Sequence, residues 1–257
     1  MATTYLTLAN EALRELNEVT LTASNFSSAV GIQAFVKEAI NRSLNDIANA
    51  EPQLPFFAAA ASGETDPFYG NVTVATVEGT RWYTLKAGSS SITTDYSSID
   101  WDDFYITTIG VSGEEAPFVS RGLRFISLGD WRRYVRDSEN ADDAKGSDAS
   151  HGEPRFVIRS PDHRKFGLSP IPDKVYNVHF YAYSKPTELS SFDDAIVLPD
   201  QYASIVLART RYYIHQFKEN MQQAAFALDD YRRGMKYMKS NLINPQPKSM
   251  TDDRVYF

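Results

Sequence analysis

The chain of 257 residues is long enough to bury a sizeable core, in one large domain or two smaller ones. Its apolar fraction of 42% and charged fraction of 23% exclude wholesale disorder, and its net charge of −7 argues against a dedicated nucleic-acid binder. The absence of cysteine excludes disulfides, thiolate catalysis and cysteine-based zinc sites. No stretch has the roughly 18 apolar residues of a membrane span, and we expect a soluble protein without a signal peptide or a membrane partner.

Two helices are predicted in the first 60 residues. Apolar residues line one side of residues 5–17, and they recur every three or four positions from Ser28 to about Ala50. The polar segment "LTASNFSS" is typical of a linker and an N-cap before the second helix. The prolines of "EPQLPFF" predict the end of that helix.

The middle of the chain, from about 65 to 187, has the composition of a β domain. Its short segments are rich in β-branched and aromatic residues, and Gly, Ser, Asp and Pro separate them. The connections are short, which favours antiparallel pairing, and one helix is predicted in "SLGDWRRYVRDSEN". The predicted strands are "NVTVATVEG", "RWYTLKA", "DDFYITTIGVSG", "PRFVIRS", "KFGLSPIP" and "KVYNVHFYAYSKP".

The last predicted strand alternates between two faces. Tyr176, Val178, Phe180 and Ala182 are expected on one face, and the set Val175, Asn177, His179 and Tyr181 on the other. Upstream of this strand, residues 137–154 form a long, charged loop. Such a loop is either a mobile excursion or a functional loop that a partner orders.

Two further helices are predicted after Pro199. The first lies in "LPDQYASIVLARTRYYIHQF", and the second begins near Lys218 and carries an apolar stripe from Met221 to Leu242. Residues 8–51 carry three basic and six acidic residues, whereas residues 200–241 carry seven basic and four acidic ones. These opposite charges either pair inside one helical bundle or let one copy dock on the next in a ring.

The chemical motifs of common enzymes are absent from the sequence. There is no nucleophile elbow, no P-loop and no dinucleotide fingerprint. One candidate is a metal site formed by His151, Asp162 and His163, but loop residues of these types are usually just solvated. The other is a glycosidase-like cleft at Asp102 or Asp103 beside Trp101, but doublets of acidic residues are also expected by chance in this sequence. We therefore expect no catalytic residue, no metal, no cofactor and no enzymatic activity.

The order of the segments resembles a known family. A short helix, a long helix ending in "NDIANAEPQLPFF" and a β-rich insertion ending in "KFGLSPIPDKVYNVHFYAYSKPTEL" precede "DDAIVLPDQYASIVLARTRYYIHQF" and a last helix. This arrangement resembles the head-to-tail adaptor (connector) proteins of tailed bacteriophages, including tail tubular protein A of short-tailed phages. The most specific part of the resemblance is the order of four features: a Pro-x-Pro strand, an aromatic strand, Pro186, and Leu198–Pro199 before the third helix.

The resemblance implies an α+β fold with a four-helix bundle, an inserted mainly antiparallel β domain and an extended C-terminal tail. The corresponding segments are residues 1–60 and 191–242 for the two helical hairpins, 61–190 for the β domain and 243–257 for the docking tail. The implied function is that of a structural virion protein at the head–tail junction, assembled in the host cytoplasm. Its copies, twelve in the family, form a ring that joins the portal protein to the tail nozzle or tail tube.

Two sets of interface residues follow from this resemblance. The C-terminal Arg254, Val255, Tyr256 and Phe257 are expected to dock on the portal, because terminal aromatic residues can anchor in a pocket. A subunit or portal interface is expected at Arg232, Arg233, Lys236 and Lys239. Genomic double-stranded DNA is expected to pass through the ring without specific binding, because an acidic surface does not retain it.

The alternative interpretation is a carbohydrate- or receptor-binding tail accessory module. Trp82, Trp101 and the tyrosines of the sheet would then act as stacking platforms for the ligand.

Overall fold

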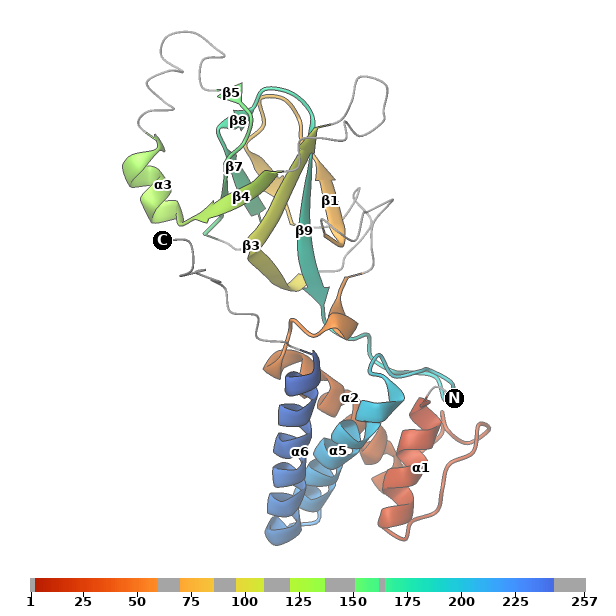
Figure 1. The fold of residues 1–257 in the computed structure, drawn as a ribbon. Helices are drawn as coiled ribbons and strands as arrows, with labels where there is room; N and C mark the ends of the chain where they lie inside the picture. Colours follow the sequence, from red (N-terminus) through yellow and green to blue (C-terminus); the bar gives the residue numbers. More distant parts are fainter. Residues whose placement is uncertain are drawn as a thin grey trace, which may run out of the picture. The chain divides into compact units, whose positions relative to one another are not determined.

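The computed structural model describes residues 3–59, 70–85, 96–108, 121–136, 151–161 and 165–242. Within these ranges the chain has an α+β fold, with five α-helices and a large, curled, mixed β-sheet (Figure 1). The chain divides into two compact units. The helical unit comprises Met1–Phe56 and Pro186–Phe257, and the β unit comprises Phe57–Lys185.

The first helix of the helical unit follows the predicted pattern. Helix α1, Tyr5–Glu15, begins after Thr4, whose side-chain hydroxyl accepts a hydrogen bond from the backbone N–H of Thr7. Its buried residues are Tyr5, Leu8, Ala9, Ala12 and Leu13. The amphipathic helix predicted from the sequence is therefore confirmed.

Helix α2, Ile32–Ala50, begins four residues later than the predicted Ser28. Asn25 accepts a hydrogen bond from the Thr22 N–H through its side chain and one from the Ser28 N–H through its carbonyl, so the polar segment forms a turn and not an N-cap. Gly31 then precedes the helix at a φ of 59°, a conformation that favours glycine. The predicted end of the helix before Pro52 is confirmed.

Two C-terminal helices complete the helical unit. A short 3₁₀ turn, η2 (Asp200–Tyr202), leads into α5, Ala203–Phe217, and α6 follows as Met221–Leu242. Helix α5 packs against α6, α2 and α1, and α1 also packs against α2. None of the helices in the described residues is long and apolar enough to cross a membrane.

The β unit is organised around a seven-stranded sheet with the order β1-β9-β3-β4-β6-β7-β2 (Figure 1). Neighbouring strands are antiparallel except β4 and β6, which are parallel. The 3₁₀ turn η1 (Pro55–Phe57) precedes the sheet, and β5 and β8 form a separate parallel pair. The bounds are β1 Val72–Ala75, β2 Trp82–Thr84, β3 Tyr96–Thr108, β4 Arg121–Ile126, β5 His151–Gly152, β6 Phe156–Arg159, β7 Lys165–Ser169, β8 Ile171–Pro172 and β9 Tyr176–Ser184, with helix α3 at Leu128–Tyr134.

Aromatic contacts show that the sheet curls around one core. Phe166 on β7 and Phe180 on β9 are separated by three strands in the sheet order, yet their ring centroids are 5.8 Å apart. Phe104 on β3 stacks on Phe180 with ring centroids 4.8 Å apart, and Tyr83 on β2 stacks on Phe166 at 5.4 Å. Side chains from every strand of the sheet therefore bury their apolar surface together.

The alternation predicted for β9 is confirmed on its core face, where Tyr176, Val178, Phe180 and Ala182 are all buried. His179, predicted on the other face, is also buried, with 2% of its surface exposed. Its Nδ1 lies 2.9 Å from the Thr73 hydroxyl and its Nε2 lies 2.8 Å from the Thr107 hydroxyl. Hydrogen bonds to both neighbouring strands thus offset the cost of burying the imidazole.

Three features of the β unit differ from the sequence predictions. Strand β4 was not predicted, and its pairing with β6 is parallel because α3 and the following segment connect the two strands. The last part of the predicted loop, His151–Gly152, forms strand β5. Residues 137–150 of that loop lie outside the described residues.

Buried tyrosines make the fold sensitive to high pH. Burial raises the pKa of Tyr5, Tyr176 and Tyr83 above the ordinary value of 10.0, and nearby carboxylates raise it further at Tyr5 and Tyr176. The folded state holds these protons more tightly, so their contribution to stability is complete below pH 10 and is lost as the pH rises above it. Far-UV circular dichroism should therefore change together with the last part of the rise in tyrosinate absorbance, because exposed tyrosines ionise without unfolding; full tyrosinate formation in a folded protein would contradict the expectation.

Candidate interaction surfaces

The predicted metal site is not assembled by the described residues. His151 lies on β5, whereas Asp162 and His163 lie outside the described residues. Within the part of the chain that the structure describes, no three His, Asp or Glu side chains are grouped closely enough to bind a metal ion.

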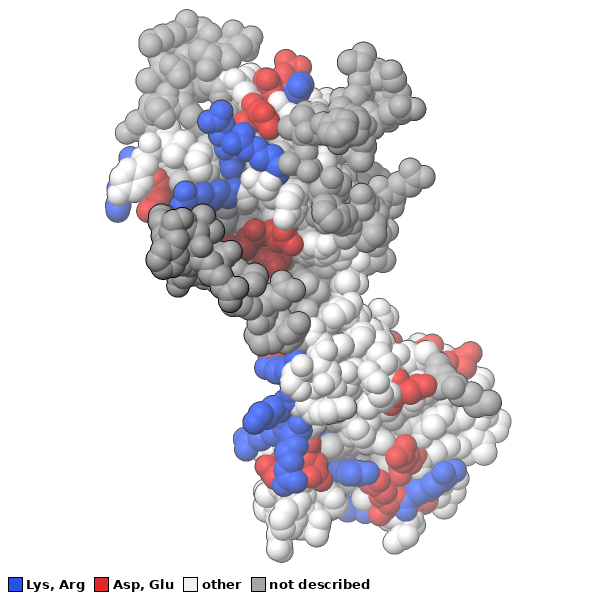
Figure 2. Space-filling model, in the orientation of Figure 1, with Lys and Arg blue, Asp and Glu red and all other residues white. Residues whose placement is uncertain are grey.

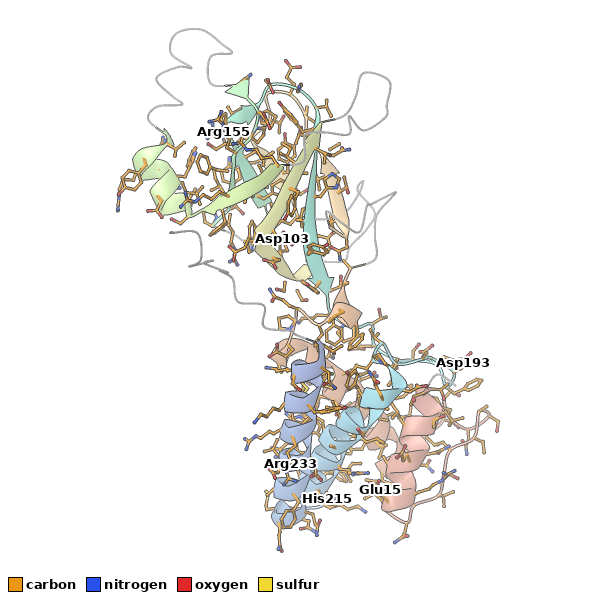
Figure 3. All side chains as sticks on the ribbon, viewed as in Figure 1. Glu15, Asp103, Arg155, Asp193, His215 and Arg233 are labelled. Atoms are coloured by element: carbon orange, nitrogen blue, oxygen red, sulfur yellow. The ribbon has the colours of Figure 1, made fainter. Side chains whose placement is uncertain are left out.

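The carboxylates of the proposed cleft lie on strand β3. Asp102 is exposed, and Asp103, which is labelled in Figure 3, is partly buried. Burial raises the pKa of the Asp103 carboxyl and Asp100 adds to this effect, while a hydrogen bond from Tyr105 opposes it. Both residues lie in the irregular part of β3 between Ile99 and Phe104, where the pairing with β9 shifts register, and the Asp103 carboxyl is engaged by the Tyr105 hydroxyl.

The two tryptophans proposed as sugar platforms are engaged within the protein. The Trp101 ring stacks on Phe104 with centroids 5.5 Å apart, and the Arg159 guanidinium lies 5.4 Å from the ring centroid. Trp82 covers the backbone of Gly167, where an added Cβ would lie 2.8 Å from the indole ring. These contacts favour structural roles for both side chains.

The described residues line a shallow concavity in each unit. In the β unit a pocket of about 300 Å³ is lined by residues that include Glu153, Arg155 and Phe156 (Figure 3 labels Arg155). In the helical unit a pocket of about 200 Å³ is lined by Glu38, Asn41, Arg42, Asn45 and Glu188. Neither brings together a nucleophile, a base and an oxyanion donor.

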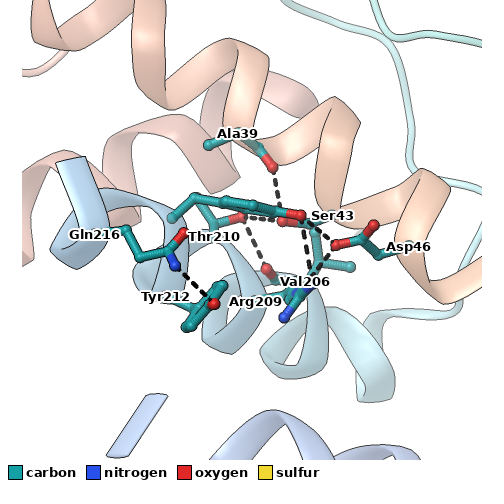
Figure 4. A network of polar contacts seen from close by, with 9 residues as sticks. Ala39, Ser43, Asp46, Val206, Arg209, Thr210, Tyr212 and Gln216 are labelled. Carbon is teal, nitrogen blue, oxygen red and sulfur yellow. Dashed lines mark hydrogen bonds and ion pairs between the residues drawn. The ribbon is translucent and has the colours of Figure 1, made fainter. Parts of the chain in front are cut away.

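A polar network joins α2 to α5 in the helical unit (Figure 4). The buried Ser43 and Thr210 hydroxyls are 3.2 Å apart, and each also lies within hydrogen-bond distance of a carbonyl of its own helix, at 2.6 Å for Ser43 and 2.8 Å for Thr210. At the edge of this network, Arg209 Nε donates to Asp46 Oδ2 at 2.6 Å, and the Tyr213 hydroxyl donates to the same oxygen at 2.5 Å. Burial first, and then this hydrogen bond, raises the pKa of Tyr213, so the phenol stays protonated.

Ion pairs with residues 200–241 of the helical unit use four of the six acidic residues found in residues 8–51. Arg209 pairs with Asp46, Arg211 with Glu15 and Lys239 with Glu51. Lys218 Nζ also lies 3.9 Å from Glu18 Oε1. The sequence allowed these charges either to pair inside one helical bundle or to join neighbouring copies. The structure shows pairing inside the helical unit for these residues.

The four predicted interface cations on α6 differ in their surroundings. Lys239 pairs with Glu51, and Arg233 pairs with Asp229 one turn earlier on the same helix. Arg232 and Lys236 are exposed and have no ion-pair partner among the described residues. Figure 2 shows Lys and Arg side chains gathered over α6. The second predicted set, Arg254 to Phe257, lies outside the described residues.

Two surfaces of the helical unit were missed from the sequence. Phe226 and Tyr237 on α6 are 58% and 64% exposed, on the side of the helix opposite its buried stripe. The segment 187–200 carries four acidic residues and no basic one, and it includes the part-exposed Phe192 and Val197. The sequence signal for the first surface is a pair of aromatic residues outside the apolar stripe of α6. The signal for the second is a local excess of acidic residues.

Comparison with known proteins gives one informative match. A family model described as SU10 adaptor protein matches residues 3–253. No curated protein matches the chain. The match covers nearly the whole sequence, both the helical unit and the β unit. The chain therefore belongs to the SU10 adaptor protein family, and it is a structural adaptor of a bacteriophage.

Proposed function

We propose that this protein is the subunit of a ring that joins the portal to the tail in the virion neck. The observation that carries the proposal is the family match across residues 3–253. In this proposal α1, α2, α5 and α6 form a bundle at the portal side, as in tail tubular protein A, and the inserted β domain meets the tail nozzle or tail tube. Twelve copies surround the path of DNA ejection, and assembly takes place in the host cytoplasm.

The charge of the protein is compatible with a DNA channel. The net charge of −7 keeps phosphates from adhering to the surface, so DNA can slide past without specific binding.

Electron microscopy of the protein mixed with the purified portal of the same phage tests the proposal. The expected result is a ring of adaptor copies coaxial with the portal, with its symmetry readable from class averages. A wild-type chain that forms no ring on the portal would exclude the proposed function. A glycan array provides the comparison, because a specific sugar ligand would favour the accessory-module alternative.

The C-terminal tail is expected to be needed for portal binding. A chain truncated after Leu242 loses Val255, Tyr256 and Phe257 and retains all described helices and strands. We expect unchanged far-UV circular dichroism and a loss of portal binding of at least about tenfold, because buried aromatic anchors dominate binding energies. Co-sedimentation with the portal measures this, and a triple alanine variant of these three residues is the full-length control. Undiminished binding of both variants would contradict the expectation.

A further inference from the structure

The outward side of α6 carries aromatic and basic side chains. Phe226, Arg233 and Tyr237 are seven and four residues apart, which places them in one row along the helix. The row is about 16 Å long at 1.5 Å per residue. Exposed fractions of 58% for Phe226 and 64% for Tyr237 are high for large apolar residues on a helix whose other side is packed on α5. Aromatic residues exposed together in this way are typical of protein interfaces.

This row lies beside a net positive charge. Residues 226–239 contain four cations and the two acidic residues Asp229 and Asp230; Arg233 pairs with Asp229, and Lys239 pairs with Glu51. Arg232 and Lys236 are exposed and have no ion-pair partner in the described part of the chain, so their charge is available to a partner. We call the surface formed by Phe226, Arg232, Arg233, Lys236 and Tyr237 the α6 face.

A second surface of the same unit has the opposite charge. The segment 187–200 contains four acidic residues, Glu188, Asp193, Asp194 and Asp200, and no basic residue. Phe192 and Val197 are 39% and 40% exposed within it, so this surface also combines charge with apolar contact area. We call the segment 187–200 the acidic segment.

The acidic segment is held in a fixed conformation. The backbone N–H groups of Tyr5 and Leu6 donate to the carbonyls of Asp194 and Phe192 at 2.9 and 3.1 Å. Asp194 Oδ2 accepts hydrogen bonds from the backbone N–H groups of Ser190 and Ser191, both at 2.7 Å. These hydrogen bonds hold the pKa of Asp194 below its ordinary value, so the carboxylate is ionised at neutral pH.

The two surfaces lie on opposite sides of the helical unit. Arg233 projects from α6 on one side, and Asp193 lies near the start of α1 on the other (Figure 3). Helix α5 contacts both α6 and α1 and thus holds the two surfaces at a fixed separation. A subunit with complementary surfaces on opposite sides can contact its neighbours head to tail, and such a contact closes into a ring when the rotation between subunits allows it.

We propose that the α6 face of one copy docks on the acidic segment of the next copy. The inference rests on the proposed ring function and identifies the two surfaces that form the ring contact. The positive charge of residues 231–239 meets the negative charge of residues 187–200, while Phe226 and Tyr237 pack against the apolar side chains of Phe192 and Val197. The partner is a second copy because both halves of the contact are present on each chain.

Charge reversal tests the contact with two variants of opposite sign. Arg232→Glu/Lys236→Glu turns two of the four cations of residues 231–239 into anions, and Glu188→Lys/Asp193→Lys turns two of the four anions of residues 187–200 into cations, so each substituted surface falls to a net charge of zero. We expect each variant alone to require at least about tenfold more protein to form rings on the portal, because each contact loses its net electrostatic attraction. An equimolar mixture of the two is expected to assemble as wild type does, in alternating order.

The control variant is Arg132→Glu/Arg133→Glu, an equal charge change on exposed residues of α3 in the β unit. It should form rings as wild type does. Ring formation by either test variant alone at the wild-type concentration, or failure of their mixture, would overturn the inference and leave the proposed function standing. Failure of the wild-type chain to form rings would instead refute the proposed function and this contact with it.

The cysteine-free sequence allows a direct test of proximity. A Lys236→Cys chain and an Asp193→Cys chain, mixed during ring assembly and oxidised, are expected to yield a disulfide-linked dimer. Arg132→Cys replaces Lys236→Cys in the control mixture. Cross-linking in the control to the same extent as in the test pair, or none in rings of the test pair, would contradict the proposed contact.

Discussion

Replacement of Phe180 by alanine is expected to lower the free energy of unfolding of the β unit by about 3–5 kcal/mol. The Phe180 side chain is fully buried, and its ring contacts those of Phe104, Phe166 and Tyr96. The three partner residues lie on β7 and β3, so the curled sheet cannot collapse into the cavity without moving two strands. Both the lost transfer free energy and the remaining cavity contribute to the cost.

Tryptophan fluorescence during urea unfolding measures this effect selectively. The three tryptophans, Trp82, Trp101 and Trp131, all belong to the β unit. Val175→Ala is the control, because Val175 directly precedes the same strand and is 46% exposed, and its change should stay within about 0.5 kcal/mol. A cost for Phe180→Ala similar to that of the control would show that these rings do not form the centre of the core.

Strand β9 could be predicted from the sequence, whereas β4 could not. In β9 an apolar or aromatic residue at every second position directly encodes a strand with one buried face. In β4 two arginines and a glycine interrupt the alternation, and only Leu123 is fully buried. Its strand conformation depends on pairing with β3 and β6, which are distant in the sequence, and local patterns do not contain that information.

The start of α2 shows a similar limit. Val30 fits the three-and-four spacing of the apolar stripe, yet it lies outside the helix and is 76% exposed. The side chain and carbonyl of Asn25 stabilise a turn that competes with helix formation. Spacing alone could not distinguish an N-cap from such a turn, because the same polar residues favour both.

The sequence identified the charged residues of the helical unit but not their partners. The ion pair of Arg209 with Asp46 joins residues 163 positions apart, and that of Arg211 with Glu15 joins residues 196 positions apart. Only the packed helices show that these charges are satisfied internally, while Arg232 and Lys236 remain exposed. The surface charge that a partner meets is therefore smaller and more localised than the charge counted along the chain.

Replacement of Asp46 by alanine is expected to lower the free energy of unfolding of the helical unit by roughly 2–3 kcal/mol. The Arg209 side chain is only 18% exposed, and its guanidinium lies about 5 Å from the rings of Tyr212, Tyr213 and Tyr231. Without Asp46, this partly buried cation loses its carboxylate and the Tyr213 hydroxyl loses its acceptor. Far-UV circular dichroism during urea unfolding measures the change, because α1, α2, α5 and α6 supply most of the helix of the described residues.

A second substitution separates the cost of the unpaired charge from the loss of packing. Asp46→Ala/Arg209→Leu is expected to recover at least about 1 kcal/mol relative to Asp46→Ala, because no uncompensated cation remains. The control is Glu38→Ala, which removes an exposed ion pair with Arg42 and should cost less than about 0.5 kcal/mol. If Asp46→Ala costs no more than this control, the link between α2 and α5 depends on the apolar side chains and on the Ser43–Thr210 hydrogen bond, and not on the charge pair.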